Sequence, residues 1–192
     1  MKIHSTKLSK AMEAKGVSAQ QLAEVVAAPA NGTTPASREA RVADATRAVN
    51  NWLGGKDHPR CDAKAIKQIA QYLGVRTVDI CAFTSQVLQH RGSPRKAKLL
   101  TDLIRGKRVD QALNLLTFNT KRAAVNIKRC LNAAITDAEA AEADTTQLFV
   151  TESRVDNASV MKRFQPKDRG RAHAIHKPFS HITISVEEKP AR

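Results

Sequence analysis

Apolar positions recur every three or four residues through the first half of the chain, the spacing of helices with one buried face. Gly16 and Gly74 follow two of these segments, where helices commonly end, and Ser18 precedes another as a candidate N-cap. The stretch Ala27–Ser37 is rich in Pro, Gly, Thr and Ala, has no apolar period and predicts a loop. The helices expected here are Thr6–Lys15, Ala19–Val26, Arg38–Leu53, Asp62–Leu73 and a short final helix over Val75–Phe83.

The second half opens with Gln86–Gly92, which alternates weakly and predicts an edge strand. Helical spacing then returns in three segments, the first of which starts at Ser-Pro and stops at a glycine. These helices are expected over Ser93–Gly106, Val109–Leu116 and Lys121–Glu142, the last capped by Asn119 or Thr120.

The apolar spacing changes to two after residue 145, which indicates strands. Thr146–Val155 and Ala174–Val186 are the expected antiparallel strands of one sheet. The segment between them, Asp156–His173, is too long for a tight turn and too charged for a core. It therefore predicts a long hairpin that projects from the body and is loosely ordered until phosphates neutralise it.

Composition narrows the classes of function. Lys and Arg exceed Asp and Glu by 14 in 192 residues, and the pI is near 10.2, so the expected partner is an anion: nucleic acid, an acidic protein or an anionic membrane. A basic protein without such a partner is the alternative. No stretch approaches the roughly 20 apolar residues of a membrane span, and the N-terminus has no apolar run like that of a secretory signal.

Cysteine and aromatic usage narrows the classes further. Cys61, Cys81 and Cys130 form no CxxC pair, so they are expected to be buried or half-buried thiols in a reducing cytoplasm. Aromatic residues make up 4% of the chain, which argues against the base-stacking platform of single-strand binders.

Positive charge is placed in two positions where a merely solvated surface would not need it. Arg95, Lys96 and Lys98 crowd the start of a helix, where the helix dipole disfavours cations unless an anion is near. The hairpin cations face only two acids, Asp156 and Asp168. Arginine suits bidentate phosphate contacts and lysine supplies point charge, a combination that reads the shape and backbone of folded RNA.

Catalytic chemistry has little support in the sequence. His173 and His176 are three apart on an expected strand and point to opposite faces, so a shared metal ion is awkward, even with His181 nearby. No glycine loop has the spacing of a nucleotide site. No catalytic residue, metal or cofactor is therefore predicted, and helix capping is the interpretation of Ser93. A metal-dependent nuclease is kept as a third hypothesis.

The N-terminal segments LSKAMEAKGVSAQQLAEVV, AVNNWLGGKDHP and AIKQIAQYLGVRTVDI resemble the Cro/repressor-type helix-turn-helix domain. That resemblance implies a DNA-reading helix carrying Arg47, Asn50 and Asn51. The loop Ala27–Ser37 departs from it, because it interrupts the tight turn that positions such a helix. A helical module for protein or RNA contacts is favoured over sequence-specific DNA reading.

The segment from SPRKAKLLTDLIRG to TDAEA, followed by VMKRFQPKDRGRAHAIHKPFSHITISV, resembles the universal large-subunit ribosomal protein L-twenty-two family over about residues 86–188. The resemblance implies a structural ribosomal RNA binder whose hairpin reaches the wall of the peptide exit tunnel. Two residues depart from the pattern: Asp168 is an acid in a normally basic stretch, and Phe179 stands where a basic residue or threonine is usual. Asp168 puts one phosphate contact in doubt. The hairpin tip implied by position is Met161, Lys162, Arg163, Phe164, Gln165, Pro166 and Lys167.

The sequence as a whole predicts an α+β protein of two domains. Residues 1–85 form an all-α helix-turn-helix-like extension, and residues 86–192 form three helices on a small antiparallel sheet with a protruding hairpin at about 153–176. The expected partners are large-subunit ribosomal RNA and neighbouring ribosomal proteins in the cytoplasm, with no membrane and no small-molecule substrate; a DNA-binding regulator is the alternative. The expected RNA contacts are Arg91, Ser93, Arg95, Lys96, Lys98, Lys107, Lys121, Lys128, Arg129, Lys162, Arg163, Lys167, Arg169, Arg171, His173, Lys177, Ser180 and His181.

Overall fold

The computed structural model describes residues 1–27 and 35–188, in two compact units, Met1–Ala82 and Phe83–Arg192. The described residues form eight α-helices and four antiparallel strands, an α+β fold. In these ranges no helix is both long and apolar enough to cross a membrane.

The N-terminal unit is a group of helices that begin and end at the capping and glycine residues of the sequence. Gly16 and Gly74 adopt left-handed φ values of 62° and 60° where two helices stop. Ser18 forms a capping box with Gln21: its Oγ accepts from the Gln21 amide at 3.3 Å, and its own amide donates to Gln21 Oε1 at 2.9 Å. The helices are α1 (Ser5–Lys15), α2 (Ala19–Val26), α3 (Pro35–Leu53), α4 (Ala63–Leu73) and α5 (Thr77–Ile80).

Two expectations for this unit need correction. Helix α3 begins at Pro35, inside the expected loop Ala27–Ser37, of which residues 28–34 lie outside the described residues. The expected helix Val75–Phe83 stops at Ile80, and Cys81 begins a strand. The cause is tertiary pairing: β1 (Lys2–Ile3) lies antiparallel to this segment, and its backbone hydrogen-bonding groups favour the extended conformation there.

Apolar faces of these helices close one core, in which Leu8, Leu22 and Ile66 are fully buried. Trp52 is anchored at the edge, because its Nε1 donates to the Pro59 carbonyl at 2.7 Å. Burial, reinforced by Asp62 and Asp57, raises the pKa of Cys61 to about 12, so this thiol stays protonated and unreactive. All three cysteines are free and buried.

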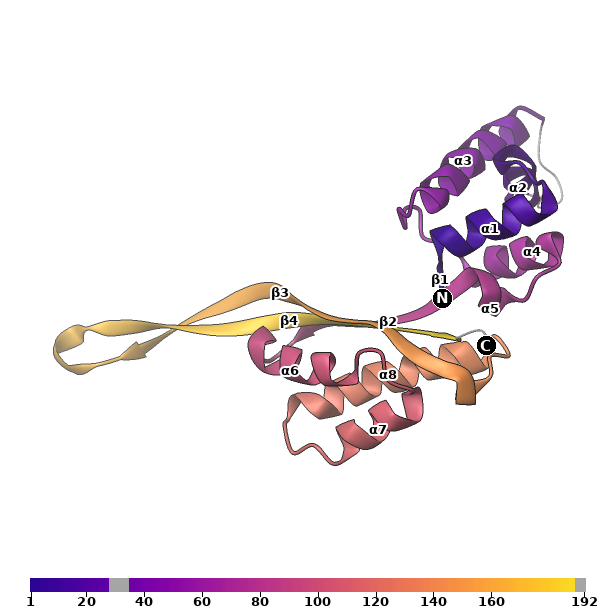
Figure 1. The fold of residues 1–192 in the computed structure, drawn as a ribbon. Helices are drawn as coiled ribbons and strands as arrows, with labels where there is room; N and C mark the ends of the chain where they lie inside the picture. The colour runs from indigo at the N-terminus through magenta and orange to yellow at the C-terminus, as the bar shows by residue number, and fades with distance from the viewer. Residues whose placement is uncertain (28–34, 189–192) are drawn as a thin grey trace. The chain divides into compact units, whose positions relative to one another are not determined.

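The C-terminal unit is a three-stranded antiparallel sheet with helices against one face (Figure 1). Strand β4 lies between β2 and β3, and the buried residues Ile182, Ile184 and Val186 alternate along it. Ile127 and Leu131, on the longest helix of this unit, are fully buried as well. The elements are β2 (Cys81–His90), α6 (Pro94–Ile104), α7 (Val109–Thr117), α8 (Ala123–Glu139), β3 (Leu148–Pro166) and β4 (Ala172–Glu188).

Several boundaries differ from those the sequence predicts. Strand β2 starts at Cys81 rather than Gln86, because residues 83–87 pair with β4. Helix α8 is shorter than Lys121–Glu142, and Asn119 acts ahead of it by accepting the Lys121 amide at 3.0 Å. Strand β3 starts at Leu148, after a 3-10 turn, η1 (Thr145–Gln147), that Asp144 caps.

Strands β3 and β4 continue as one paired ribbon far beyond the helices (Figure 1). A β-bulge between Asn157 and Val160 separates the ribbon from the rest of the sheet. Between these two pairs β3 advances by three residues while β4 advances by two. Pro178, which has no amide proton to donate, lies opposite Val160 at this bulge. We call Val160–Pro178 the arm, and the paired segments 148–157 and 180–188 the base.

Candidate nucleic-acid interface

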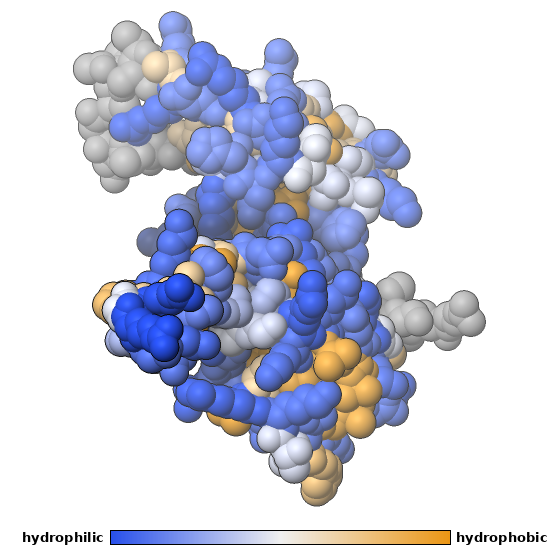
Figure 2. Space-filling view, turned by 90° about the vertical axis from the view of Figure 1, so that its left-hand side faces the viewer, coloured by the Kyte–Doolittle hydropathy of each residue, from blue (hydrophilic) through white to orange (hydrophobic). Residues whose placement is uncertain are grey.

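The arm is charged and has no core. Every one of its residues is exposed or half-buried. Pairing runs from Val160↔Pro178 to Pro166↔Ala172, so β3 alone extends about 20 Å past the bulge at 3.4 Å per residue. Figure 2, seen from the side of the arm's tip, shows strongly hydrophilic side chains crowding its end. The arm carries one acid, Asp168, and six cations: Lys162, Arg163, Lys167, Arg169, Arg171 and Lys177.

The arm cations are not neutralised by their own chain. Among the described residues, none of the six is within 4.0 Å of a carboxylate, and the only hydrogen bond found for their side chains is from Arg163 to the adjacent Lys162 carbonyl at 3.0 Å. Some cations elsewhere do have carboxylate partners. Arg105 pairs with Asp102 at 3.0 Å, and Arg154, in the base, lies between two carboxylates.

The chain reverses at Lys167–Arg171. The Lys167 amide donates to the Arg171 carbonyl at 2.7 Å, and Arg169 and Gly170 take left-handed φ values of 53° and 71°. Of the residues expected at the tip, Met161–Pro166 form the last paired rungs of β3 and Lys167 begins the turn. Phe164 is 74% exposed there.

The start of α6 presents a second set of cations. Arg95, Lys96 and Lys98 are all exposed, as the sequence predicts. Ser93 occupies the N-cap position, but its side chain makes no capping hydrogen bond, so helix capping does not explain this residue. Pro94 has no amide proton and the Lys96 amide donates to the Ser93 carbonyl at 3.1 Å, so the first turn of α6 offers an anion mainly its positive side chains.

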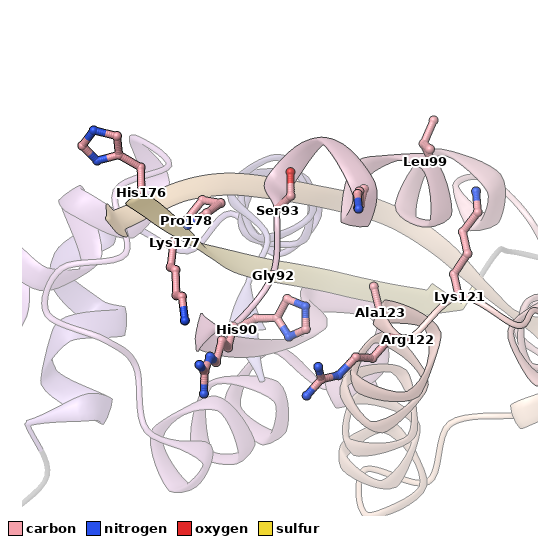
Figure 3. Close-up of a pocket in the computed structure, with 12 residues that line it drawn as sticks. His90, Gly92, Ser93, Leu99, Lys121, Arg122, Ala123, His176, Lys177 and Pro178 are labelled. Atoms are coloured by element: carbon pink, nitrogen blue, oxygen red, sulfur yellow. The ribbon is translucent and has the colours of Figure 1, made fainter. Parts of the chain in front are cut away.

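A pocket of about 780 Å³ opens beside this helix start (Figure 3). Its walls come from the end of β2, the starts of α6 and α8, and the arm where it joins the base. The lining residues are His90–Ser93, Lys96, Leu99, Lys121–Ala123 and His176–Pro178.

His90 is the best-buried of the charged or polar residues that line the pocket, at 7% exposed. Its Nδ1 lies 2.8 Å from the side-chain amide nitrogen of Asn126, on α8. Burial, with a smaller contribution from the Arg122 charge, lowers the pKa of His90, so the ring is neutral at pH 7. In Figure 3 the His90 ring and the Arg122 side chain point toward one another, Lys177 comes from β4, and the His176 ring turns away.

The remaining expected contacts divide into three groups. Arg91, Lys121, Arg129 and His173 are exposed, and Lys107 is half-buried. Lys128 donates to Thr117 Oγ1 at 2.9 Å, and His181 Nδ1 accepts the Gln89 amide at 3.2 Å, so both have partners within the chain.

Ser180 needs correction. Its side chain is fully buried, because it lies opposite Asn157 and His90 on the two neighbouring strands. It cannot touch RNA without opening the sheet, and it is removed from the expected contacts.

The expected contacts omitted seven lining residues of the pocket: His90, Gly92, Leu99, Arg122, Ala123, His176 and Pro178. Arg122 could have been included, since it adjoins Lys121 at an expected helix start. His90 carries no local signal, because its burial depends on α8 packing against the end of β2. The described residues contain no group of three or more His, Cys, Asp or Glu placed to hold a metal ion.

These observations define an α+β protein with two groups of exposed cations, one at a helix start and one on an arm, the latter without a carboxylate partner among the described residues. A family model described as Ribosomal protein L22p/L17e matches residues 86–187. Three curated relatives, each named large ribosomal subunit protein uL22, align with about the same half of the chain. That of Beijerinckia indica is 49% identical over 102 residues, covering 53% of this chain and 79% of the relative.

The relative from Syntrophotalea carbinolica is 44% identical over 100 residues, covering 52% of this chain and 91% of its own length. The relative from Brucella abortus is 50% identical over 99 residues, covering 51% and 77%. The chain belongs to the Ribosomal protein L22p/L17e family, through its C-terminal unit.

Proposed function

We propose that the protein is a structural constituent of the large ribosomal subunit, which binds and organises large-subunit ribosomal RNA. The observation that carries this proposal is the arm, where six cations project from a folded body without acidic partners among the described residues. The family supplies the context: its curated relatives are named as large-subunit proteins. The arm is proposed to reach the wall of the polypeptide exit tunnel in the cytoplasmic ribosome, next to other ribosomal proteins.

The mechanism is binding without turnover. Each arm cation that meets a phosphate releases condensed counterions, and this release favours association. Arg163, Arg169 and Arg171 suit bidentate phosphate contacts, while the lysines act as point charges. Such contacts follow the backbone and shape of folded RNA rather than its base sequence.

The N-terminal unit is proposed as a separate domain, with the boundary near residue 85. Its likeness to a Cro/repressor helix-turn-helix stays a prediction, and DNA binding gains no support. Asn51, one of the three expected DNA-reading residues, donates its side-chain amide to the His58 carbonyl at 2.8 Å. Arg47 lies 3.4 Å from Asp44. A contact with surface RNA or a neighbouring protein is the role we favour for this unit.

The proposal is tested by the salt dependence of binding to large-subunit ribosomal RNA. Replacing Lys162, Arg163 and Arg169 with Gln should lower the slope of log K against log salt by about 2–3, because each lost phosphate contact removes about 0.7–0.9. The matched control is a triple Gln variant at Arg76, Arg105 and Arg154, which each pair with a carboxylate.

The control variant should change the slope far less than the arm variant. An arm variant with the wild-type slope would show that these cations do not meet RNA. A wild-type chain with no measurable affinity for the RNA would overturn the proposed function itself.

A further inference from the structure

The pocket beside α6 combines a cationic rim with apolar surface in its walls. Five Lys or Arg side chains and no carboxylate are among its described lining residues. Leu99, Ala123 and Pro178 add apolar surface. A flat cationic patch would suffice for backbone phosphates alone, so the hollow and its apolar walls call for a ligand that is part anion and part flat apolar group.

The anion subsite lies where two helices begin. Helices α6 and α8 both start at the pocket, and neither Ser93 nor Arg122, the two N-cap residues, caps its helix with its side chain. The positive ends of the two helix dipoles add to the positive potential of Lys96, Lys121 and Arg122. Two helix starts and several cations lie around one hollow, without an acid among the described lining residues, and this environment suits the negative charge of a phosphodiester.

The interior offers a neutral hydrogen-bonding ring beside apolar surface. The Asn126 amide nitrogen can only donate, so His90 Nδ1 accepts its hydrogen bond and the proton of the neutral ring resides on Nε2. Nε2 lies on the Gly92 side of the ring, where an added Cβ would come within 2.6 Å of it. Gly92 and His90 both line the pocket, and glycine leaves the room that the ring needs.

We propose that this pocket receives one nucleotide turned out of folded RNA, its phosphate at the rim formed by Lys96, Lys121 and Arg122 and its base against Leu99, Ala123 and Pro178. The inference rests on the proposed function and deepens it, because it adds a position at which the chain reads an unstacked base. The volume of about 780 Å³ lies within the range of small-ligand pockets and exceeds what a phosphate alone requires. Unstacked bases are the usual targets of specific RNA recognition.

An acidic peptide is the competing occupant, and the observations favour RNA over it. Carboxylate side chains would satisfy the rim cations but would leave the apolar walls without a flat partner. The pocket also adjoins the arm through His176–Pro178, so an RNA bound along the arm passes its mouth.

The test is chemical probing of the ribosomal RNA at single-nucleotide resolution, with the full-length chain bound. Ala123→Leu fills the pocket and keeps every charge and the helix propensity of α8. Ala133→Leu is the matched control, the same substitution at an exposed position of the same helix away from the pocket. With wild type and the control, one or two adjacent unpaired nucleotides should be protected. With Ala123→Leu that protection should be lost, and affinity should fall about tenfold, the order of one base-stacking contact.

A second variant guards against misfolding of the first. Lys96→Met keeps the length of an exposed side chain and removes its charge, and Lys98→Met is its control on the same helix outside the pocket. Lys96→Met should weaken protection of the same nucleotides, whereas Lys98→Met should not.

Three outcomes would overturn the pocket proposal while leaving the proposed function standing. Unchanged protection with folded Ala123→Leu would mean that no nucleotide enters. Loss of salt dependence in Lys96→Met without any change at a particular nucleotide would mean that the rim meets backbone phosphates only. Protection at the arm alone, together with capture of an acidic peptide that Ala123→Leu abolishes, would assign the pocket to a protein.

Discussion

The base and the arm of one hairpin share a continuous antiparallel ladder but differ in almost everything else. In the base, Leu148, Val150, Ile182 and Ile184 are fully buried. In the arm, pairing continues for seven rungs while no side chain is buried and six cations are present. Backbone hydrogen bonding alone contributes little net stability, so the same ladder is held by packing in one part and lacks that support in the other.

The difference shows what the arm is for. A two-stranded ribbon without a core is marginal in water, and like charges along it repel one another. Phosphates around the arm would neutralise this repulsion. The base therefore holds the fold together, and we propose that the arm binds the RNA.

The sharpest way to break this comparison is to remove buried volume from each part. Ile184→Ala in the base should lower the free energy of unfolding by about 2–5 kcal/mol, because it leaves a cavity in a closed core. Val160→Ala in the arm, where the side chain is 47% exposed, should change it by no more than about 0.5 kcal/mol. Urea unfolding of the full-length chain measures both. Equal losses at the two positions would show that the arm is packed as tightly as the base.

A smaller expected effect is the dependence of the free energy of unfolding on pH, which compares buried His90 with an exposed histidine of the arm. Burial lowers the pKa of His90 in the folded chain below the ordinary 6.5, so the unfolded chain takes up this proton more readily. The contribution of neutral His90 to the free energy of unfolding is complete above pH 6.5. It is lost as the pH falls from 6.5 toward the lowered pKa of the folded chain.

Between pH 7.5 and pH 5, the free energy of unfolding should therefore fall less for His90→Asn than for the wild type. His173→Asn, an exposed position on the arm, is the matched control and should keep the acid sensitivity of the wild type. Identical pH profiles for wild type and His90→Asn would contradict the burial of this ring.

The sequence predicted correctly those helices and strands whose bounds are set by residues close to them in the chain. The Ser18 cap, the glycine stops and the apolar faces placed α1, α2 and α4 within a residue of their observed bounds, since capping and amphipathic spacing act within a few residues. The alternation of Ile182, Ile184 and Val186 likewise placed the base of the hairpin.

The errors lie where distant pairing decides. Cys81–Phe83 has the composition of a helix end but is drawn into a sheet by β1 and β4, a contact that local spacing cannot encode. Of the seven residues expected at the hairpin tip, only Lys167 lies in the reversal Lys167–Arg171, because pairing extends to Pro166. The pocket was not foreseen for the same reason, since it joins segments from four elements.

The central claim, that RNA rather than the protein's own core holds the arm, is tested most directly by hydrogen exchange of the free and RNA-bound chain. In the free chain the paired amides of the arm at 161–165 and 173–177 should exchange orders of magnitude faster than those of the base at 182–186, because local opening exposes them without unfolding the body. Binding of large-subunit ribosomal RNA should slow the arm strongly and the base little. Arm amides as well protected as the base in the free chain, or unchanged by RNA, would contradict the claim.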